Sequence, residues 1–381
     1  MNSARYILLT SLLCISILGT SSFNLAIAQY TCTILDPIGY STSRISGISG
    51  ASFAGHGFNT ASNGQHALLW NGTSNMVDLN PTGFSNTFAR SVSGNFQVGN
   101  GLGTVTGNAN HALLWSGTAN SVVDLNPTGF TYSTAFGVSG NLQTGAGGGA
   151  STGNNDHALL WSGTASSVID LNPSGYIAST SRGISGNYQV GYGYQTTPGT
   201  QARALLWNGT ASSVIDLSPV GFGDSYALAV AGNHQVGYGS ASTPGSDHHA
   251  LLWNGTASSA VDLHPVGFSQ SIASAVFGNF QVGSGVPTQG IRHALIWNGT
   301  ASSALDLNDF TVGLPINFVY TDATGVDAAG NVVGYGVDNQ GREHPLLWTI
   351  TTAPEPGSLI FLALGIVLIT ILGRKRFKSS I

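Results

Sequence analysis

The chain has 381 residues, 53 of them glycine, a charged fraction of only 7% and a formal net charge of −5. Residues 29–353 contain no lysine, and their six arginines stand against fifteen acidic residues, which leaves this segment with a net charge of −9. Such a balance excludes the basic surface that a nucleic-acid backbone requires, so nucleic acid is not expected as a partner.

The N-terminus has the pattern of a secretory signal peptide. A basic start and the apolar run 7–18 lead to Ala26 and Ala28, the small residues that frame a cleavage site. We therefore predict export, with residues 1–28 as the signal peptide. Cys32 would then be the only cysteine left, so no intramolecular disulfide could form.

Residues 29–350 are dominated by a repeat of about 45 residues. Each unit contains a segment such as 66–70, His-Ala-Leu-Leu-Trp, and the tryptophans fall at positions 70, 115, 161, 207, 253, 297 and 348. A fixed period in this range is typical of stacked supersecondary units, none of which can bury its apolar face alone.

One unit reads as four short strands, which in the second repeat are 89–93, 97–99, 111–115 and 122–125. Gly-Asn pairs follow the first strand and several Asn-Gly pairs follow the third, and both favour tight hairpin turns. The region shows no helical periodicity. Four-stranded antiparallel units of this length predict the blades of a β-propeller, with each tryptophan filling the space between blades. A β-solenoid is the alternative, although its coils are usually shorter.

The hairpin grouping also predicts how the ring closes. The last blade, 322–348, lacks a fourth strand, whereas residues 33–40 match 77–84 and have no blade of their own. Pairing the two would hide the last exposed edges. The expected fold is an all-β, seven-bladed propeller whose N-terminal strand completes the last blade.

Residues 351–381 form a separate tail. The motif Pro354, Glu355, Pro356 precedes the apolar run 359–372, and a basic cluster follows at Arg374, Lys375 and Arg376. The basic cluster is expected to stay cytoplasmic. Because the run is shorter than the roughly 20 residues that span a bilayer, we expect a C-terminal hydrophobic helix that anchors the chain in the membrane at least transiently.

Two family resemblances follow from these motifs. The tail resembles the PEP-CTERM sorting domain, which implies an exosortase-type processing enzyme as partner, cleavage near 354–356, and delivery to the cell surface or an exopolysaccharide matrix. The repeat, over roughly residues 33–348, resembles the HAF-type extracellular repeat through His-Ala-Leu-Leu-Trp, Gly-Asn-x-Gln-Val-Gly and Asp-Leu. Leu stands here for the name-giving Phe, and Asp-Leu-Asn-Pro for Asp-Leu-Gly. This second family implies fold and location but no established activity.

The repeated histidines and aspartates are the residues that most suggest a metal or catalytic site. The histidines are His66, His111, His157, His249, His293 and His344, with Arg203 in the fourth unit. Metal ligands lie about 2 Å from the ion, whereas equivalent positions of separate blades lie far apart unless they line the axis. We therefore expect each histidine to hydrogen-bond within its own blade, to the aspartate of that blade.

The aspartates are Asp78, Asp124, Asp170, Asp216, Asp262 and Asp306, and Ile34 takes this place in the N-terminal strand, which predicts an incomplete ring of acids. Identical sites in separate blades do not supply the pair of close carboxylates that glycoside hydrolysis needs.

Other short motifs also have structural explanations. Residues 149–153 match a nucleophile elbow and 145–150 a dinucleotide loop, but neither precedes a helix. The Asn-Gly-Thr sequons are explained by the turn itself, and begin at Asn71, Asn208, Asn254 and Asn298. We expect no catalytic, cofactor or metal site.

A ligand is expected at the end of the blades that carries the loops of variable length, because binding residues tend to lie on loops held by a rigid scaffold. The candidate residues are Tyr192, Tyr194, Phe84, Phe130, Tyr176, Phe222 and Phe268. The alternative for the last five is packing at the blade edge. The expected function is non-catalytic binding or scaffolding in an extracellular or exopolysaccharide matrix, and the alternative is a secreted propeller hydrolase or lyase acting on polysaccharide.

Overall fold

The computed structural model describes residues 29–196, 201–241 and 247–351. The predicted signal peptide, with Ala26 and Ala28, and the sorting motif with its basic cluster lie outside the described residues. Two compact units are distinguished along the chain, and the unit described here is Thr31–Thr349.

Seven four-stranded antiparallel sheets make up this unit, and each is one blade. Blade 1 consists of β2 (Tyr40–Ser49), β3 (Ser52–Asn59), β4 (Gly64–Asn71) and β5 (Asn75–Asp78). Blade 2 consists of β6 (Phe84–Ser93), β7 (Phe96–Gly103), β8 (His111–Trp115) and β9 (Val123–Asp124). Blade 3 consists of β10 (Tyr132–Ser139), β11 (Leu142–Gly148), β12 (His157–Trp161) and β13 (Ile169–Asp170).

Blade 4 consists of β14 (Tyr176–Ser185), β15 (Tyr188–Gln195), β16 (Ala202–Asn208) and β17 (Ile215–Asp216). Blade 5 consists of β18 (Phe222–Ala231), β19 (His234–Ala241), β20 (His248–Trp253) and β21 (Val261–Asp262). Blade 6 consists of β22 (Phe268–Phe277), β23 (Phe280–Pro287), β24 (His293–Trp297) and β25 (Leu305–Asp306). Blade 7 consists of β26 (Phe318–Val326), β27 (Val332–Asp338), β28 (Glu343–Thr351) and β1 (Gln29–Ile34).

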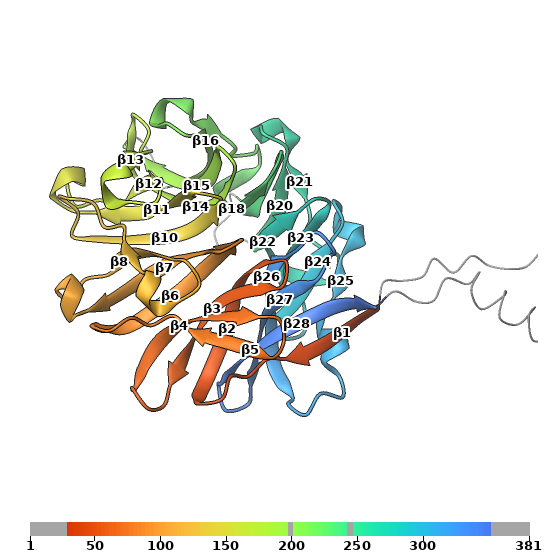
Figure 1. The fold of residues 1–381 in the computed structure, drawn as a ribbon. Coiled ribbons are helices and arrows are strands. Elements are labelled where there is room, and N and C mark those ends of the chain that lie inside the picture. Colours follow the sequence, from red (N-terminus) through yellow and green to blue (C-terminus); the bar gives the residue numbers. More distant parts are fainter. Residues whose placement is uncertain (1–28, 197–200, 242–246, 352–381) are drawn as a thin grey trace, which may run out of the picture. The chain divides into compact units, whose positions relative to one another are not determined.

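The seven blades are arranged around a common axis (Figure 1), which confirms the predicted propeller. The innermost strand of each blade faces the axis; the other three follow outward in chain order in blades 1 to 6, whereas in blade 7 the outermost strand is β1. The predicted closure is confirmed as well, since β1 pairs with β28, and red and blue ribbons lie side by side in Figure 1.

The closure is fastened by both backbone and side chains. The Leu35 N–H donates to the Pro345 carbonyl at 2.9 Å, and the Trp70 indole N–H donates to the Leu35 carbonyl at 3.2 Å. The Leu35 side chain is buried in a cluster that also contains Val333 of blade 7. The N-terminal strand therefore joins blade 7 to blade 1.

The core lies between neighbouring blades, as expected for the tryptophans. Trp115 of blade 2 is fully buried against Leu69 and Leu79 of blade 1. Trp161 and Trp253 occupy the same place in later junctions. Each blade thus completes the apolar face of the one before it, which is why a single repeat cannot be stable alone.

Two glycines in each second strand allow the inner part of a blade to pack closely. A Cβ on Gly99 would overlap the carbonyl oxygen of Phe88, where β6 carries a bulge. A Cβ on Gly101 would lie 2.9 Å from the Phe84 ring, so glycine leaves the room in which this ring packs. The Gly-x-Gly spacing of the repeat is therefore a packing requirement.

The two connections at one end of each blade differ in length. The first is a tight turn with Gly94 at φ +55°, as predicted. The second was also predicted to be tight, but in blades 2 to 6 it is longer, because a 3-10 turn follows the glycine. These turns are η2 (Ala119–Ser121), η4 (Ala165–Ser167), η5 (Ala211–Ser213), η6 (Ala257–Ser259) and η7 (Ala301–Ser303).

Three more 3-10 turns lie in loops: η1 (Thr104–Thr106), η3 (Ala150–Thr152) and η8 (Asn308–Thr311). Within the described ranges we find no helix with the length and hydropathy needed to span a bilayer.

Candidate functional site

The repeated histidines hydrogen-bond within their own blades, which confirms their structural interpretation. In blades 1, 2, 3, 5 and 6 the imidazole Nδ1 lies 2.6–2.8 Å from a carboxylate oxygen of the aspartate in the fourth strand, as for His111 and Asp124 at 2.7 Å. Blade 4 places the Arg203 guanidinium at the same spot, 2.6 Å from Asp216. Either side chain holds the third strand to the fourth, so neither needs a ligand.

This pair continues into a chain of hydrogen bonds that reaches the next blade. The second carboxylate oxygen of Asp124 accepts the Asn126 N–H at 2.8 Å. The Asn126 side chain accepts the Ser133 hydroxyl at 2.7 Å, and Ser133 in turn accepts the Ala112 N–H at 3.0 Å. The His-Ala and Asp-Leu-Asn segments of the repeat are thus explained by one network that joins blades 2 and 3.

The ring of acids is complete, contrary to our expectation for the N-terminal strand. Ile34 does stand at the aspartate position, but Asp36, two residues later, turns back so that its carboxylate lies 2.8 Å from His344 Nδ1. The opposite imidazole nitrogen lies 3.3 Å from Asp338. Burial opposes ionisation of Asp338, yet hydrogen bonds from Arg342 hold its pKa below the usual range. Comparison of the repeats does not identify Asp36, because this residue lies two positions after Ile34, which matches the aspartates of the other repeats.

The five aromatic residues predicted at the variable-loop end lie half-buried against the blade cores. Phe84, Phe130, Tyr176, Phe222 and Phe268 each pack on an apolar cluster between blades. Their placement favours the packing alternative.

Tyr192 and Tyr194, by contrast, belong to an aromatic group on β15, β18 and β19. The Tyr192 ring centroid lies 6.0 Å from that of Tyr194 and 4.9 Å from that of Tyr226. The Tyr226 ring in turn stacks on the Tyr238 ring, with 4.7 Å between the two centroids. Burial, with a smaller contribution from Tyr194, raises the pKa of Tyr226. This group is the part of the predicted ligand face that the structure brings together.

The motif at 149–153 does not form a nucleophile elbow. Ser151 lies in the 3-10 turn η3, and its hydroxyl donates to the Gly129 carbonyl at 3.2 Å. The described residues contain no group of three or more histidine, cysteine or acidic side chains placed to hold a metal ion.

A cavity of about 630 Å³ lies on the axis and is lined by all seven blades. Its walls are the last residues of each first strand and the hairpin turn that follows, so it opens at the end with the tight turns, opposite the variable loops. We call it the axial funnel. Its volume is within the range of small-ligand sites, roughly 300–1,000 Å³.

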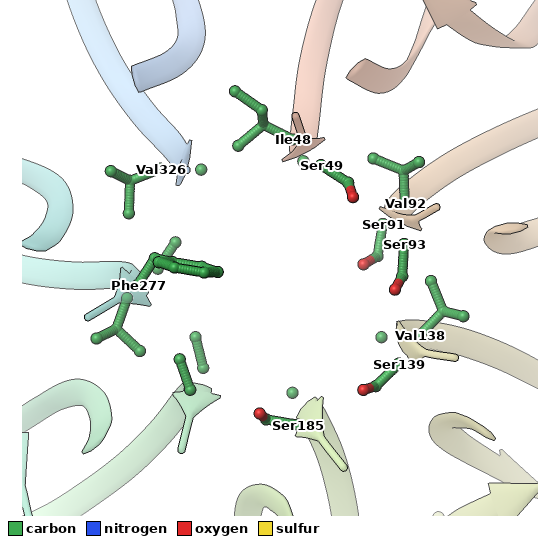
Figure 2. Close-up of a pocket in the computed structure, with 18 of the residues that line it drawn as sticks. Ile48, Ser49, Ser91, Val92, Ser93, Val138, Ser139, Ser185, Phe277 and Val326 are labelled. Atoms are coloured by element: carbon green, nitrogen blue, oxygen red, sulfur yellow. The ribbon is translucent and has the colours of Figure 1, made fainter. Parts of the chain in front are cut away.

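The rim of the axial funnel is stabilised by serines (Figure 2). The hydroxyl oxygens of Ser49, Ser93, Ser139 and Ser185 each accept the N–H of the hairpin glycine in the next blade, at 3.0–3.4 Å. In blade 6, Phe277 takes this position, is 47% exposed, and extends its ring toward the middle of the opening.

The floor of the axial funnel is a ring of seven equivalent residues: Ser46, Arg90, Phe136, Arg182, Leu228, Ser274 and Thr324. The same seven line a second cavity of about 240 Å³, so this axial ring is where the two cavities meet. Three consecutive blades contribute two guanidinium groups and an aromatic ring, whereas blades 6, 7 and 1 contribute hydroxyl groups.

The two arginines of the axial ring flank Phe136. The guanidinium carbon of Arg182 lies 4.2 Å from the Phe136 ring centroid, and that of Arg90 lies 5.4 Å from it. Burial, together with repulsion from Arg182 and Arg44, lowers the pKa of Arg90 to about 10, which leaves the group protonated at neutral pH. Burial also lowers the pKa of Arg182. Because the guanidinium of arginine stays protonated in proteins, the axial ring carries two positive charges.

The axial ring is not among the residues expected from the sequence, which indicated a candidate ligand face at the variable-loop end of the blades. A signal was present, because the position differs from blade to blade while its neighbours repeat. The sequence does not show that these seven positions lie together; the tertiary structure brings them to the axis.

Neither a protein-family model nor a curated protein matches the sequence. Among solved structures, the β-propeller domain of the Trilobed protease from Pyrococcus furiosus, described as having an open velcro topology, is 12% identical with a TM-score of 0.51 and covers 83% of this chain and 98% of its own. Puromycin hydrolase is 11% identical with a TM-score of 0.51, covering 83% of this chain but 55% of its own. Oligogalacturonate lyase from Vibrio parahaemolyticus is 11% identical with a TM-score of 0.48, covering 85% and 94%. Identities this low show the propeller fold alone.

Proposed function

We propose that this protein is a non-catalytic binding module of an extracellular or exopolysaccharide matrix, and that the axial funnel is its binding site. The observation that carries the proposal is the irregularity of the axial ring. In a repeat protein, residues that the fold needs recur from unit to unit, as the tryptophans do in all seven blades and the His–Asp pairs in six. The axial ring instead presents five residue types at seven equivalent positions, in a cavity open to solvent.

The funnel rim suits a saccharide. Aromatic faces and hydroxyl groups are the usual polar-apolar mixture of small-ligand sites, and Phe277 supplies an exposed ring at the mouth. The repeated carboxylates, in contrast, are engaged by histidine, arginine and backbone N–H groups of their own blades. Binding is therefore favoured over the polysaccharide hydrolase or lyase alternative.

Delivery to the surface is part of the same proposal. It rests on the signal peptide and on the tail that resembles a PEP-CTERM domain, with an exosortase-type enzyme as the processing partner. Mass spectrometry of the secreted protein tests it. A mature chain that begins at Gln29 and ends near Pro354-Glu355-Pro356 is expected, and a matrix protein that retains residues 357–381 would contradict sorting by cleavage.

Binding is tested by co-sedimentation of the full-length chain with exopolysaccharide from the producing strain. Phe277→Ser places at the rim the residue that four other blades carry there, and we expect about tenfold weaker binding because a stacking surface is lost. The comparison variant, Tyr194→Glu, adds charge toward the variable-loop end; Tyr192 is left unchanged because it lies near enough to Arg182 to affect the pKa of that residue. Loss of binding only in this second variant would move the site to the variable-loop end.

The catalytic alternative is measured on the same samples. Release of new reducing ends or unsaturated ends from the polysaccharide, above that of a heat-unfolded control, would contradict the non-catalytic assignment.

A further inference from the structure

The axial ring holds the two arginines that lack an acidic partner. Among the described residues, Arg44, Arg203, Arg292 and Arg342 each form an ion pair with a carboxylate, at 2.6–3.3 Å. Arg90 donates only to the Asn100 side-chain oxygen at 2.9 Å, and the guanidinium of Arg182 makes no hydrogen bond to any described residue. Acids outnumber arginines fifteen to six between residues 29 and 353, so this lack of partners is not a shortage of acids.

A partly buried cation without a counter-ion is disfavoured, because the surrounding protein displaces part of its water and supplies no compensating ion pair. Contact with Phe136 offsets part of that cost. It does not use the five N–H donors of a guanidinium, which lie in one plane and match a carboxylate or sulfate in a forked pair. Both guanidinium groups lie against the ring of Phe136, with their carbon atoms 5.4 Å (Arg90) and 4.2 Å (Arg182) from its centroid. The two positive charges are therefore near each other.

The acids nearest to the axial funnel are already engaged. Asp327, at the rim, accepts hydrogen bonds from the backbone of Ala329 and Asn331 at 2.9 Å. Asp322, two residues before Thr324 of the ring, lies 3.3 Å from the Arg292 guanidinium. No carboxylate of the described residues pairs with Arg90 or Arg182, so an anion entering the funnel meets two unneutralised cations.

Ser46 stands next to Arg90 in the ring and Ser274 stands two blades beyond Arg182; their hydroxyl groups have no hydrogen-bond partner among the described residues, and both residues line the same cavity. The ring thus offers charged donors together with hydroxyl groups that can both donate and accept. A sugar ring that bears an acidic group has the matching pattern.

We propose that the axial ring binds the anionic group of an acidic saccharide unit, a carboxylate or sulfate ester, which enters the funnel from the end with the tight turns. Arg90 and Arg182 hold the anionic group, Ser46 and Ser274 contact sugar hydroxyls, and Phe277 stacks on a sugar ring at the mouth. This inference rests on the proposed function and names its ligand class.

The experiment is isothermal titration calorimetry of the full-length chain with trigalacturonate, a sulfated galactose trisaccharide, the neutral galactose trisaccharide and inorganic sulfate. We expect at least about tenfold tighter binding of one or both acidic trisaccharides than of the neutral one. Which of the two binds identifies the source of the anionic group. Equal binding of the neutral sugar, or binding of inorganic sulfate only, overturns the inference.

Arg182→Leu is the decisive variant, because Leu228 shows that leucine fits this position of the ring. Binding of the acidic trisaccharide is expected to fall at least about tenfold, while the unfolding temperature stays equal or rises, since a partly buried charge without an ion-pair partner is removed. Arg90→Ser, which reproduces Ser46 and Ser274, provides an independent test if either variant folds poorly. Unchanged affinity in a folded variant overturns the inference.

Arg203→His is the matched control. It removes a guanidinium from an ion pair outside the funnel and installs the residue that the other blades use to hold the same aspartate, and it should leave affinity unchanged. If the neutral trisaccharide binds and Phe277→Ser weakens it, the proposed function stands while the anionic ligand is wrong. If no saccharide and no exopolysaccharide binds, both fail.

Discussion

His56 lies buried at the junction of blades 1 and 2, with its ring 4.9 Å from Phe88 in an edge-on contact. Its Nδ1 has no hydrogen-bond partner. Burial, then repulsion from Arg44 and Arg90, lowers its pKa to about 3. The imidazole is therefore neutral in the folded protein above about pH 3, mainly because it is buried and to a lesser extent because Arg44 and Arg90 disfavour a further positive charge beside them.

This depressed pKa predicts a pH dependence of stability. Below the usual pKa of about 6.5 the unfolded chain takes up a proton that folded His56 refuses. The free energy of unfolding should therefore fall as pH drops from about 6.5 to about 3, by up to about 1.4 kcal/mol per pH unit from this group. Urea unfolding at a series of pH values measures it.

His56→Asn isolates the effect, since Asn100 occupies the matching position in blade 2. The difference in unfolding free energy between wild type and this variant should change with pH over that window. A difference that stays constant between pH 7 and pH 4 would show that His56 takes up its proton in the folded state.

Within a blade, one buried glutamine joins the two connections at the funnel end. The Gln143 side-chain N–H donates to the Asn141 carbonyl and its oxygen accepts the Gly163 N–H, both at 2.8 Å. Gln97, Gln189, Gln235 and Gln281 repeat this geometry in the other blades from 2 to 6. Phe53 and Val332 stand at this position in blades 1 and 7. The Gln of the repeat motif is thus a clamp between turns.

Gln143→Leu keeps the side-chain volume close to that of glutamine but leaves a backbone donor and acceptor without their partner. We expect a loss of about 1–3 kcal/mol in the free energy of unfolding. Gln143→Glu retains an acceptor for the Gly163 N–H but buries a carboxyl group against the Asn141 carbonyl, so it should lose at least as much. Urea unfolding curves for the two variants give the comparison, and equal stability of the leucine variant and wild type would rule the clamp out.

The propeller as a whole depends on the junction between its two chain ends. β1 belongs to blade 7 in the sheet, while Leu35 packs with residues of blade 1 and blade 7. In the other six blades the fourth strand follows the third along the chain, whereas β1 is held against β28 in blade 7 by noncovalent contacts alone. Burial raises the pKa of Cys32 in β1 to about 12, so its thiol is a protected reporter of this junction.

Leu35→Ala should lower the free energy of unfolding by about 2–5 kcal/mol, because it opens a cavity in the closing junction. Alkylation of Cys32 at pH 8, followed by peptide mass spectrometry, should accelerate in the same variant as β1 detaches. Ile38→Ala is the control in the same segment, since Ile38 is 99% exposed. Equal effects of the two substitutions would argue against closure by β1.

The sequence alone determined the all-β class, the seven blades, their four-strand grouping and the closure by the N-terminal strand, because period, turn residues and apolar alternation are local signals that recur. It also identified the His–Asp pairs as structural, because repetition itself argues for a role in the repeat. The sequence could not show which residues, distant along the chain, come together in space. Ile34 suggested a missing acid until the backbone brought Asp36 to His344, and Arg90, Phe136 and Arg182 lie 46 residues apart in sequence yet meet in one ring. Only the closed tertiary structure places side chains from seven separate strands around one axis and so forms the axial funnel.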